Sequence, residues 1–518
     1  MGTRSNNSQI VSEASNAFTA QQSWRALGGL CLGMFVCFAN TTAFNIALPT
    51  ISVSLAAGQA EQQWMVSSYN LIFAAFMLIS GSLGDRWGTK RTLLLGTGAS
   101  IAASFIGIFA SNSITTIIAR GLMGLGAGFY VPMGPAIIKH LFASDKQMRA
   151  LTLGAIAMTL GAPFGLILGG LLVHFADWRS IFVFDFVAFI GITLLNALLL
   201  PHSGQLSCRR KTRFVRLPFA SVFFALVGLS LLSAGLINAQ VSLSTPDSWG
   251  LVLAGLLATV LFVYHDTHSL NPLAELDLLR TPSFLASLVA LFALNLAIAG
   301  ILFVLPTYAE TALENNALLG AIMFMPMVGA AIAGSVIVKH LADRVGKRGA
   351  CIGSLICIAL GLVGMALSTI GASYPVLIAG QCVCGLGMGM GLPVMQSWGI
   401  EHVSEQQAGG AAALISTFQQ IGCLVGISAL GSLVGSLYVT ACRGSAAEGF
   451  ASIALAFEAA NQDATHAQAI RDAASGAYAH AILITFCITA SALLLLAACI
   501  ALVSRAKREE DHVRSRAS

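Results

Sequence analysis

Charged residues are scarce in this chain, and their scarcity decides its class. Only 9% of its 518 residues are Asp, Glu, Lys or Arg, and 56% are apolar. Soluble domains carry about a quarter charged residues, so a soluble globular protein is excluded and the surface must face hydrocarbon. The net charge is only +5, and the placement of the bases matters more than their total. We expect a lipid bilayer, and no nucleic acid, as the partner of this surface.

Clusters of metal-ligating residues and an early apolar segment are also lacking. The 11 Cys residues are scattered, and the close pair Cys382 and Cys384 lies in an uncharged run without a second pair or a His. We interpret these thiols as small apolar packing residues and expect no disulfide framework, no metal and no cofactor. Residues 1–24 are polar, so no cleavable signal peptide is expected and the first span would direct insertion.

Long apolar runs are what the chain has in abundance. A membrane-spanning helix needs roughly 20 apolar residues, and fourteen windows meet this need. They predict an all-α polytopic membrane protein. The predicted spans are residues 26–50, 62–83, 92–110, 114–138, 150–174, 179–200, 219–239, 248–264, 283–309, 315–337, 350–370, 375–399, 409–440 and 479–503.

The placement of the basic residues predicts the orientation. Of the 27 Lys and Arg residues, all except Arg120, Arg179, Arg443 and Arg471 fall in the tails or in alternate loops between the spans. Basic residues concentrate on the cytoplasmic side of a membrane. We therefore expect both termini in the cytoplasm and the protein in an inner or plasma membrane. An odd number of spans would not sort the charges in this way.

Two related loops predict an internal repeat, as in secondary transporters. The loop at 81–91 carries a glycine, acid and base cluster, and a degenerate copy follows at 339–348. The halves would be a first six-helix bundle at 26–200 and a second at 283–504. A tail (1–25), a linker with two inserted spans (201–282), an outer loop (443–478) and a second tail (505–518) complete the predicted division. Phe450, Ile453 and Phe457 predict a short amphipathic helix in that outer loop.

Each repeat loop is a candidate gate. An acid lies beside bases at the start of a helix, where charge-assisted contacts are favourable, and such a contact can hold one state of a two-state machine. A helix cap in a basic inner loop is the alternative. The candidate gating residues are Gly81, Asp85, Arg86, Gly88, Lys90, Arg91, Asp343 and Arg344.

Glycines recur along one side of the fifth predicted span. Small residues permit close helix crossings, and we interpret Gly161, Gly165, Gly169 and Gly170 as a packing stripe of pliant helices. Four further glycines between 385 and 391 superficially suggest a nucleotide-binding loop. They lie inside an apolar span with no strand before them, so we reject that interpretation.

Ionisable residues inside apolar spans are costly and are default candidates for function. Arg120 lies early in the fourth span and Asp185 early in the sixth, whereas Glu310 follows the ninth. An acid in such a place could carry a proton. The structural alternatives are an interhelical ion pair for Arg120, a carboxylate at the headgroup level for Asp185 and a loop acid for Glu310.

The chain resembles the major facilitator superfamily, and within it the 14-span drug:proton antiporters. The resemblance rests on the loop motif at 81–91, on Asn45-Ile-Ala-Leu-Pro49, on Arg120 with Gly124, Gly126 and Pro132, and on the glycine stripe followed by Trp178 and Arg179. It implies two six-helix bundles with two extra helices, alternating access, a small-molecule substrate and the proton gradient as energy source. Fourteen spans form a sufficient unit, so we expect a monomer.

The chain departs from the family pattern at three positions. The resemblance implies an acid at Asn40, a proline at Leu166 and an asparagine at Asp185. Since Asn40 cannot ionise, the proton site could have moved to Asp185, or coupling could be lost. If Asn40 lines the cavity, as the resemblance implies, a preference for cationic cargo is weakened and neutral or zwitterionic cargo is favoured.

We therefore predict an efflux transporter that exports small amphipathic compounds in exchange for protons. Arg120, Asp185, Glu310 and Asn40 are the candidates for coupling and substrate contact. A facilitator or symporter of the same fold is the alternative. A membrane enzyme would need clustered nucleophiles, metal ligands or paired carboxylates, which the sequence does not show. A non-transporting sensor is the remaining class.

Overall fold

The computed structural model describes residues 20–201, 219–238, 246–268, 276–312, 317–371, 373–403, 408–462 and 465–517. These residues form helices and include no strand. In chain order the helices are α2 (Ala20–Ser54), α3 (Gln59–Trp87), α4 (Thr89–Ile108), α5 (Ser113–Leu141), α6 (Ser144–Phe175), α7 (Ser180–Leu199), α9 (Phe219–Asn238), α10 (Pro246–Thr267), η1 (Leu276–Arg280), α11 (Pro282–Thr307), η2 (Tyr308–Ala312), α12 (Ala317–Ile322), α13 (Met325–Ser368), α14 (Tyr374–Gly399), η3 (Ile400–His402), α15 (Ala408–Cys442), α16 (Ile453–Gln462) and α17 (Ala467–Ala517).

Many of these helices suit a bilayer. Within the described ranges, 11 helices are long and apolar enough to cross a membrane, which confirms the all-α polytopic class. One of them, Leu318–Ser368, covers most of both predicted spans, 315–337 and 350–370. α9 is counted only as a shorter apolar helix, and α3 is not among the 11. The count of fourteen spans stays a prediction.

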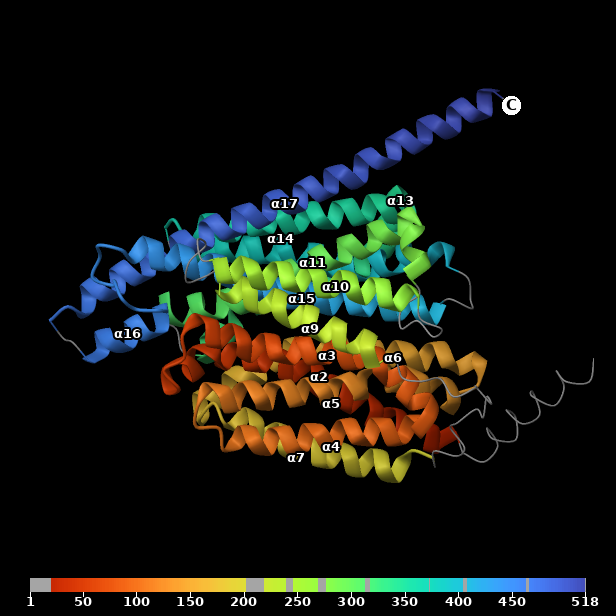
Figure 1. Cartoon of the computed structure of the whole chain (residues 1–518), viewed down its shortest axis with the longest axis horizontal. Coiled ribbons are helices and arrows are strands. Elements are labelled where there is room, and N and C mark those ends of the chain that lie inside the picture. Colours follow the sequence, from red (N-terminus) through yellow and green to blue (C-terminus); the bar gives the residue numbers. More distant parts are fainter. Residues whose placement is uncertain are drawn as a thin grey trace, which may run out of the picture. The chain divides into compact units, whose positions relative to one another are not determined.

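The chain divides into two compact units, each described here by itself. The first comprises residues 1–51, 64–230 and 255–273, and the second comprises 52–63, 231–254 and 274–518. In the first unit α4 packs along both α5 and α7. These three helices lie side by side in Figure 1. In the second unit α13 packs on α14 and α11 on α15, and α17 contacts α13 and α15.

The repeat loops share an unusual backbone conformation. Gly88 has φ 93° and Gly346 has φ 76°, a region that residues with a side chain rarely adopt. Gly88 separates α3 from α4, and Gly346 is the one non-helical residue inside α13. The glycine of each motif therefore turns the chain between two helices, and Gly346 marks where the predicted spans 315–337 and 350–370 separate.

The repeat also extends to a contact between the third and sixth helices of each half. Lys90 Nζ donates to the carbonyls of Ala197 (2.7 Å) and Leu200 (2.6 Å) at the end of α7. Arg348 Nη2 donates to the carbonyls of Ile500 and Ala501 in α17. Carbonyls at helix C-termini lack intrahelical partners and favour a cation. Lys90 therefore fastens the end of α7, whereas Arg348 contacts carbonyls inside α17, each within its own unit.

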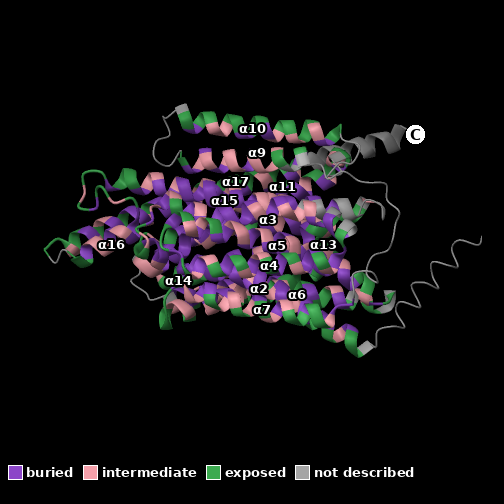
Figure 2. Ribbon diagram, turned by 60° about the horizontal axis from the view of Figure 1, so that its bottom comes forward, coloured by how far each residue is buried: buried purple, intermediate pink, exposed green. Residues whose placement is uncertain are grey.

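The described parts of α9 and α10 are poorly buried. α10 shows mostly exposed and intermediate residues in Figure 2, and its apolar window is 17% buried inside the protein. A Cβ atom added at Gly228 or Gly235 of α9 would lie within 3.1 Å of backbone atoms of α10. The two helices thus pack on each other and leave apolar surface for lipid, as spanning helices do.

The short helix α16 lies in the predicted outer loop, but its packed face differs from the predicted one. α16 begins at Ile453, so Phe450 lies before it. Its buried residues are Ile453, Ala454, Ala456 and Ala460, while Phe457 is half-buried, with its ring 5.9 Å from the Arg471 guanidinium. An amphipathic helix is confirmed, but small alanines rather than spaced phenylalanines form its packed face.

Candidate functional site

The glycine stripe of α6 sets the position of α2. A Cβ atom added at Gly161, Gly165 or Gly169 would lie 2.4, 2.1 or 2.6 Å from the carbonyl oxygens of Phe35, Ala39 and Ala43, respectively. Carbon atoms pack at about 3.5–4.0 Å, so only glycine permits this approach. Thr42 Oγ1 also donates to the Ala162 carbonyl at 2.7 Å. Gly170 is buried as well. The stripe fixes the segment of α2 that carries Asn40.

Asn40 joins two buried charged residues of the first unit. Its Oδ1 accepts a bond from Arg120 Nη1 of α5 at 2.5 Å, and its Nδ2 donates to Asp185 Oδ2 of α7. The three residues are 4%, 0% and 1% exposed. Three of the four residues predicted for coupling or substrate contact thus form one network. Glu310 belongs to the second unit.

The network places a neutral amide between opposite charges. An amide has an acceptor on one side and donors on the other, so Asn40 can serve the guanidinium and the carboxylate together. Buried charges require partners that satisfy their hydrogen bonds. The chain therefore keeps Arg120 and Asp185 connected without placing an acid at position 40. A proton taken up by Asp185 would remove the negative charge at one end of this bridge.

Two aromatic rings hold the Arg120 guanidinium. Its central carbon lies 4.2 Å from the ring centroid of Phe44 and 4.6 Å from that of Tyr69, within the range of cation–π attraction. Nε donates to the Met65 carbonyl at 3.4 Å. These contacts fix the plane of the guanidinium. The sequence prediction did not name these rings as partners of Arg120, although an arginine in an apolar span requires such partners.

One nitrogen of the Arg120 guanidinium takes no part in these contacts. Nη2 is buried and has no hydrogen-bond partner among the described residues. A buried donor without an acceptor costs free energy, and more so when it is charged. Hydrogen bonds therefore connect Arg120 to Asp185 through Asn40, while Nη2 of Arg120 has no acceptor among the described residues.

An aromatic column leads from this network to the end of the bundle. Phe44 contacts Phe182, and Phe182 contacts Trp178, with ring centroids 6.1 Å apart in both pairs. Trp178 is fully buried. The motif residues Trp178 and Arg179 therefore have different tasks, since the tryptophan packs under the column that supports Arg120.

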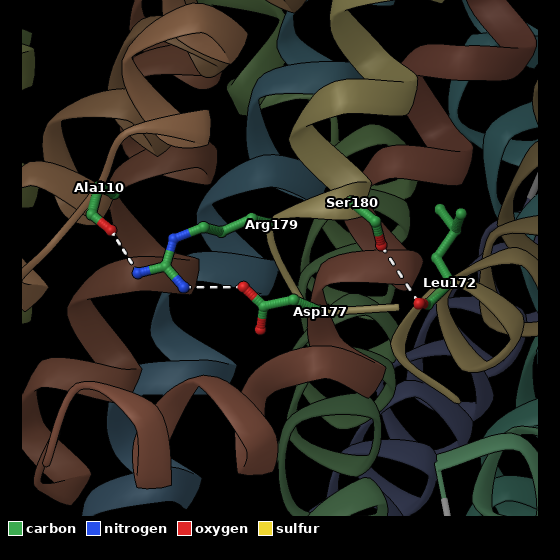
Figure 3. Close-up of polar contacts among 5 residues, drawn as sticks. All are labelled: Ala110, Leu172, Asp177, Arg179 and Ser180. Atoms are coloured by element: carbon green, nitrogen blue, oxygen red, sulfur yellow. Dashed lines mark hydrogen bonds and ion pairs between the residues drawn. The ribbon is translucent and has the colours of Figure 1, made fainter. Parts of the chain in front are cut away.

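Arg179 fastens the ends of three helices, as Figure 3 shows. Its Nη1 pairs with Asp177 at 2.7 Å, and its Nη2 donates to the Ala110 carbonyl just after α4 at 2.8 Å. Ser180, at the start of α7, donates to the Leu172 carbonyl of α6 at 3.2 Å. The bond from Arg179 satisfies a carbonyl just after the C-terminus of α4, where backbone carbonyls lack intrahelical partners, and the Leu172 carbonyl accepts from Ser180 in addition to the Ala176 N–H. These bonds hold α4, α6 and α7 in register near Asp185.

Glu310 lies in a different kind of site. It belongs to the π-helical turn η2, which follows α11, and its Oε1 is buried without a partner among the described residues. π-Helical turns are often found at functional sites. Gly320 of α12 faces it, since a Cβ there would lie 3.1 Å from Glu310 Cγ. The sequence placed Glu310 after a helix but gave no sign of the π-helical turn.

The gating candidates are only partly described. The side chains of Asp85 and Arg86 lie outside the described residues. Lys90 contacts the end of α7, whereas Gly81, Arg91, Asp343 and Arg344 are exposed. In the second loop, Lys347 rather than Arg344 forms an ion pair, with Glu401 at 3.2 Å. The role of these residues as a gate stays a prediction.

Metal ligands are not gathered in the part of the chain that the structure describes. No three His, Cys, Asp or Glu side chains group there as a metal site requires. The Arg120–Asn40–Asp185 network is held by hydrogen bonds between an amide and two charged side chains. What this arrangement can do is hold a buried charge pair and change its balance when a proton arrives.

Curated relatives include a transporter, an efflux pump and a resistance protein by name. The chain is 30% identical over 79% of its length to a probable actinorhodin transporter of Streptomyces coelicolor, covering 72% of that protein. It is 26% identical to the multidrug efflux pump LfrA of Mycolicibacterium smegmatis, covering 83% and 84% of the two chains. It is 27% identical to the multidrug resistance protein Stp of Mycobacterium tuberculosis, covering 78% and 74%.

Solved structures share the fold. A sulfate complex of the peptide transporter POT superposes with a TM-score of 0.64 at 14% identity, covering 93% of this chain and 94% of that one. An inward-facing bacterial homologue of the human lysosomal transporter Spinster gives 0.62 at 15% identity, covering 93% and 98%. The family model described as Major Facilitator Superfamily matches residues 30–427, and the chain belongs to that superfamily.

Proposed function

We propose that this protein exports small amphipathic compounds from the cell in exchange for protons. The family and the curated relatives are transporters rather than enzymes, and two of those relatives, LfrA and JefA, are efflux pumps by name. The observation that carries the exchange is the fully buried Asp185, which is linked to Arg120 only through the amide of Asn40.

The network supplies a two-state device. With Asp185 ionised, its charge offsets that of Arg120 across the amide. With Asp185 protonated, the positive charge of Arg120 is no longer offset. The free energy of this arrangement of α2, α5 and α7 therefore differs between the two protonation states. A proton can shift a conformational equilibrium only by such a difference between two states. Asp185 is therefore the proton carrier in this proposal, and the glycine contacts of α6 with α2 transmit the change.

The test is transport in everted membrane vesicles from a host without its own pumps. Vesicles that contain the protein should accumulate a fluorescent amphipathic dye when their interior is acidified. Nigericin, which collapses the pH gradient, should stop this accumulation. The same-fold alternative, a facilitator or symporter, predicts accumulation that nigericin leaves unchanged or that reverses sign with the gradient. That result would remove proton exchange from the proposal.

The proposal includes the orientation and the oligomeric state. Both termini would lie in the cytoplasm and the transporting unit would be a monomer. Val345 is 53% exposed and Ala446, after α15, is exposed too. In a cysteine-free background, an impermeant thiol reagent added to intact cells should label Ala446→Cys and spare Val345→Cys. Labelling of Val345→Cys from outside would reverse the orientation.

A further inference from the structure

Nη2 of Arg120 is a buried donor that no acceptor in the described chain satisfies. The surroundings of this donor indicate which class of cargo could bind to it. Four contacts hold the guanidinium: the Phe44 and Tyr69 rings, within 4.6 Å of its central carbon, the Met65 carbonyl on Nε, and Asn40 on Nη1. Nη2 cannot turn toward another acceptor without breaking these contacts. A positively charged donor left unpaired in an apolar interior is costly, so the position favours any ligand that offers it an oxygen.

The charges beside this donor exclude a permanent cation. The nearest acid, Asp185, is already bonded to the Asn40 amide. Asn40, which bonds the guanidinium directly, carries no charge. A cation brought to Nη2 would therefore contact a guanidinium directly, while the negative charge of Asp185 lies farther away, on the other side of the Asn40 amide. Like charges at close range repel strongly in a low dielectric medium.

An anionic group fits less well than a neutral one. An anion on Nη2 would be repelled by ionised Asp185 and would favour its protonated form. Cargo and proton would then bind together, which leads to cotransport. Exchange requires that cargo binds with Asp185 ionised. A neutral carbonyl accepts from Nη2 without this penalty.

We propose that Arg120 Nη2 is the cargo-binding donor, and that the exported compounds present an uncharged carbonyl oxygen to it. This inference rests on the proposed export function and names its substrate class.

Nile red and Nile blue test the proposal, because they share one ring system. Nile red has a carbonyl oxygen where Nile blue has a cationic nitrogen. Cells of a pump-deficient host that contain the protein are loaded with either dye and then re-energised. After the export rate of cells without the protein is subtracted, Nile red should leave about tenfold faster than Nile blue. Loss of one hydrogen bond to a charged group corresponds to a factor of this size.

Two variants separate binding from folding. Arg120→Lys keeps the charge but loses the planar fork, and it should reduce Nile red export about tenfold. Asn40→Asp adds a carboxylate beside Arg120 and should shift the ratio of the two rates toward Nile blue. Arg149→Lys is the control, since Arg149 is an exposed arginine near the Trp24 ring, and its ratio should equal that of the wild type. Immunoblots match the amounts of protein.

Several outcomes would overturn the inference. The wild-type protein could prefer Nile blue or export neither dye. The Arg120→Lys protein could also keep the wild-type ratio of Nile red to Nile blue export, which is the result expected if a water molecule, and not the cargo, occupies Nη2. A preference for Nile red that survives nigericin supports the cargo class while it contradicts proton exchange. The two proposals therefore fail separately.

Discussion

Replacing Gly165 by alanine tests the packing that positions Asn40. The new Cβ would lie 2.1 Å from the Ala39 carbonyl oxygen and 2.3 Å from Thr42 Oγ1. Because ordinary contacts are about 3.5–4.0 Å, α2 and α6 must separate by roughly 1 Å or more. Overpacking of this kind costs about 1–3 kcal/mol. The separation also weakens the bond from Thr42 to the Ala162 carbonyl, worth about 1 kcal/mol.

The assay combines stability with transport. We expect Gly165→Ala to lower the midpoint of thermal unfolding in detergent, followed by tryptophan fluorescence, and to reduce gradient-driven export because Asn40 moves with Ala39. Gly98→Ala is the matched control on α4, where nothing lies within 4 Å of the added methyl. It should leave both quantities unchanged or raise stability slightly. If the two variants behave alike, the close approach of α2 and α6 does not position the network.

Three further substitutions test other parts of the account. Asn40→Ala should destabilise the protein by about 1–3 kcal/mol for each charged group it leaves unsatisfied, measured as a lower unfolding midpoint; a neutral effect would show that the bridge is unimportant. Lys90→Gln should cost about 0.3–1 kcal/mol, because the end of α7 loses its cation, and Lys90→Arg should restore the midpoint if the contact is what matters. Arg179→Gln should lower the midpoint by a similar amount and leave the ratio of Nile red to Nile blue export unaltered; a changed ratio would place Arg179 in cargo binding.

The sequence was sufficient to find the members of the network but not their connections. Arg120 and Asp185 stand out because charges in apolar runs are costly, and Asn40 stands out through the family pattern. The bridge depends on how α2 is rotated against α5 and α7. That rotation is set by the glycine stripe and by Thr42, whose contacts are visible only in three dimensions.

Other parts were predictable to different degrees. The repeat loops share a pattern that placed Gly88 and Gly346 correctly, because a turn between helices needs a residue that tolerates positive φ. Their bases were expected to pair with acids, and the contact of Lys90 with backbone carbonyls carries no sequence signal. Glu310 illustrates the same limit, because helical periodicity does not reveal that the turn after α11 is π-helical.

Asp185 is the proton carrier in the proposed exchange, and proton movement across a liposome membrane tests this role. Purified protein in liposomes with an internal pH dye should report proton movement when cargo is added on the opposite side of the membrane. Asp177 is the matched control, an acid in the same segment whose side chain is 53% exposed and pairs with Arg179. We predict that Asp185→Asn abolishes cargo-driven proton movement and that Asp177→Asn retains it. Cargo-driven proton movement that persists in Asp185→Asn would contradict the account.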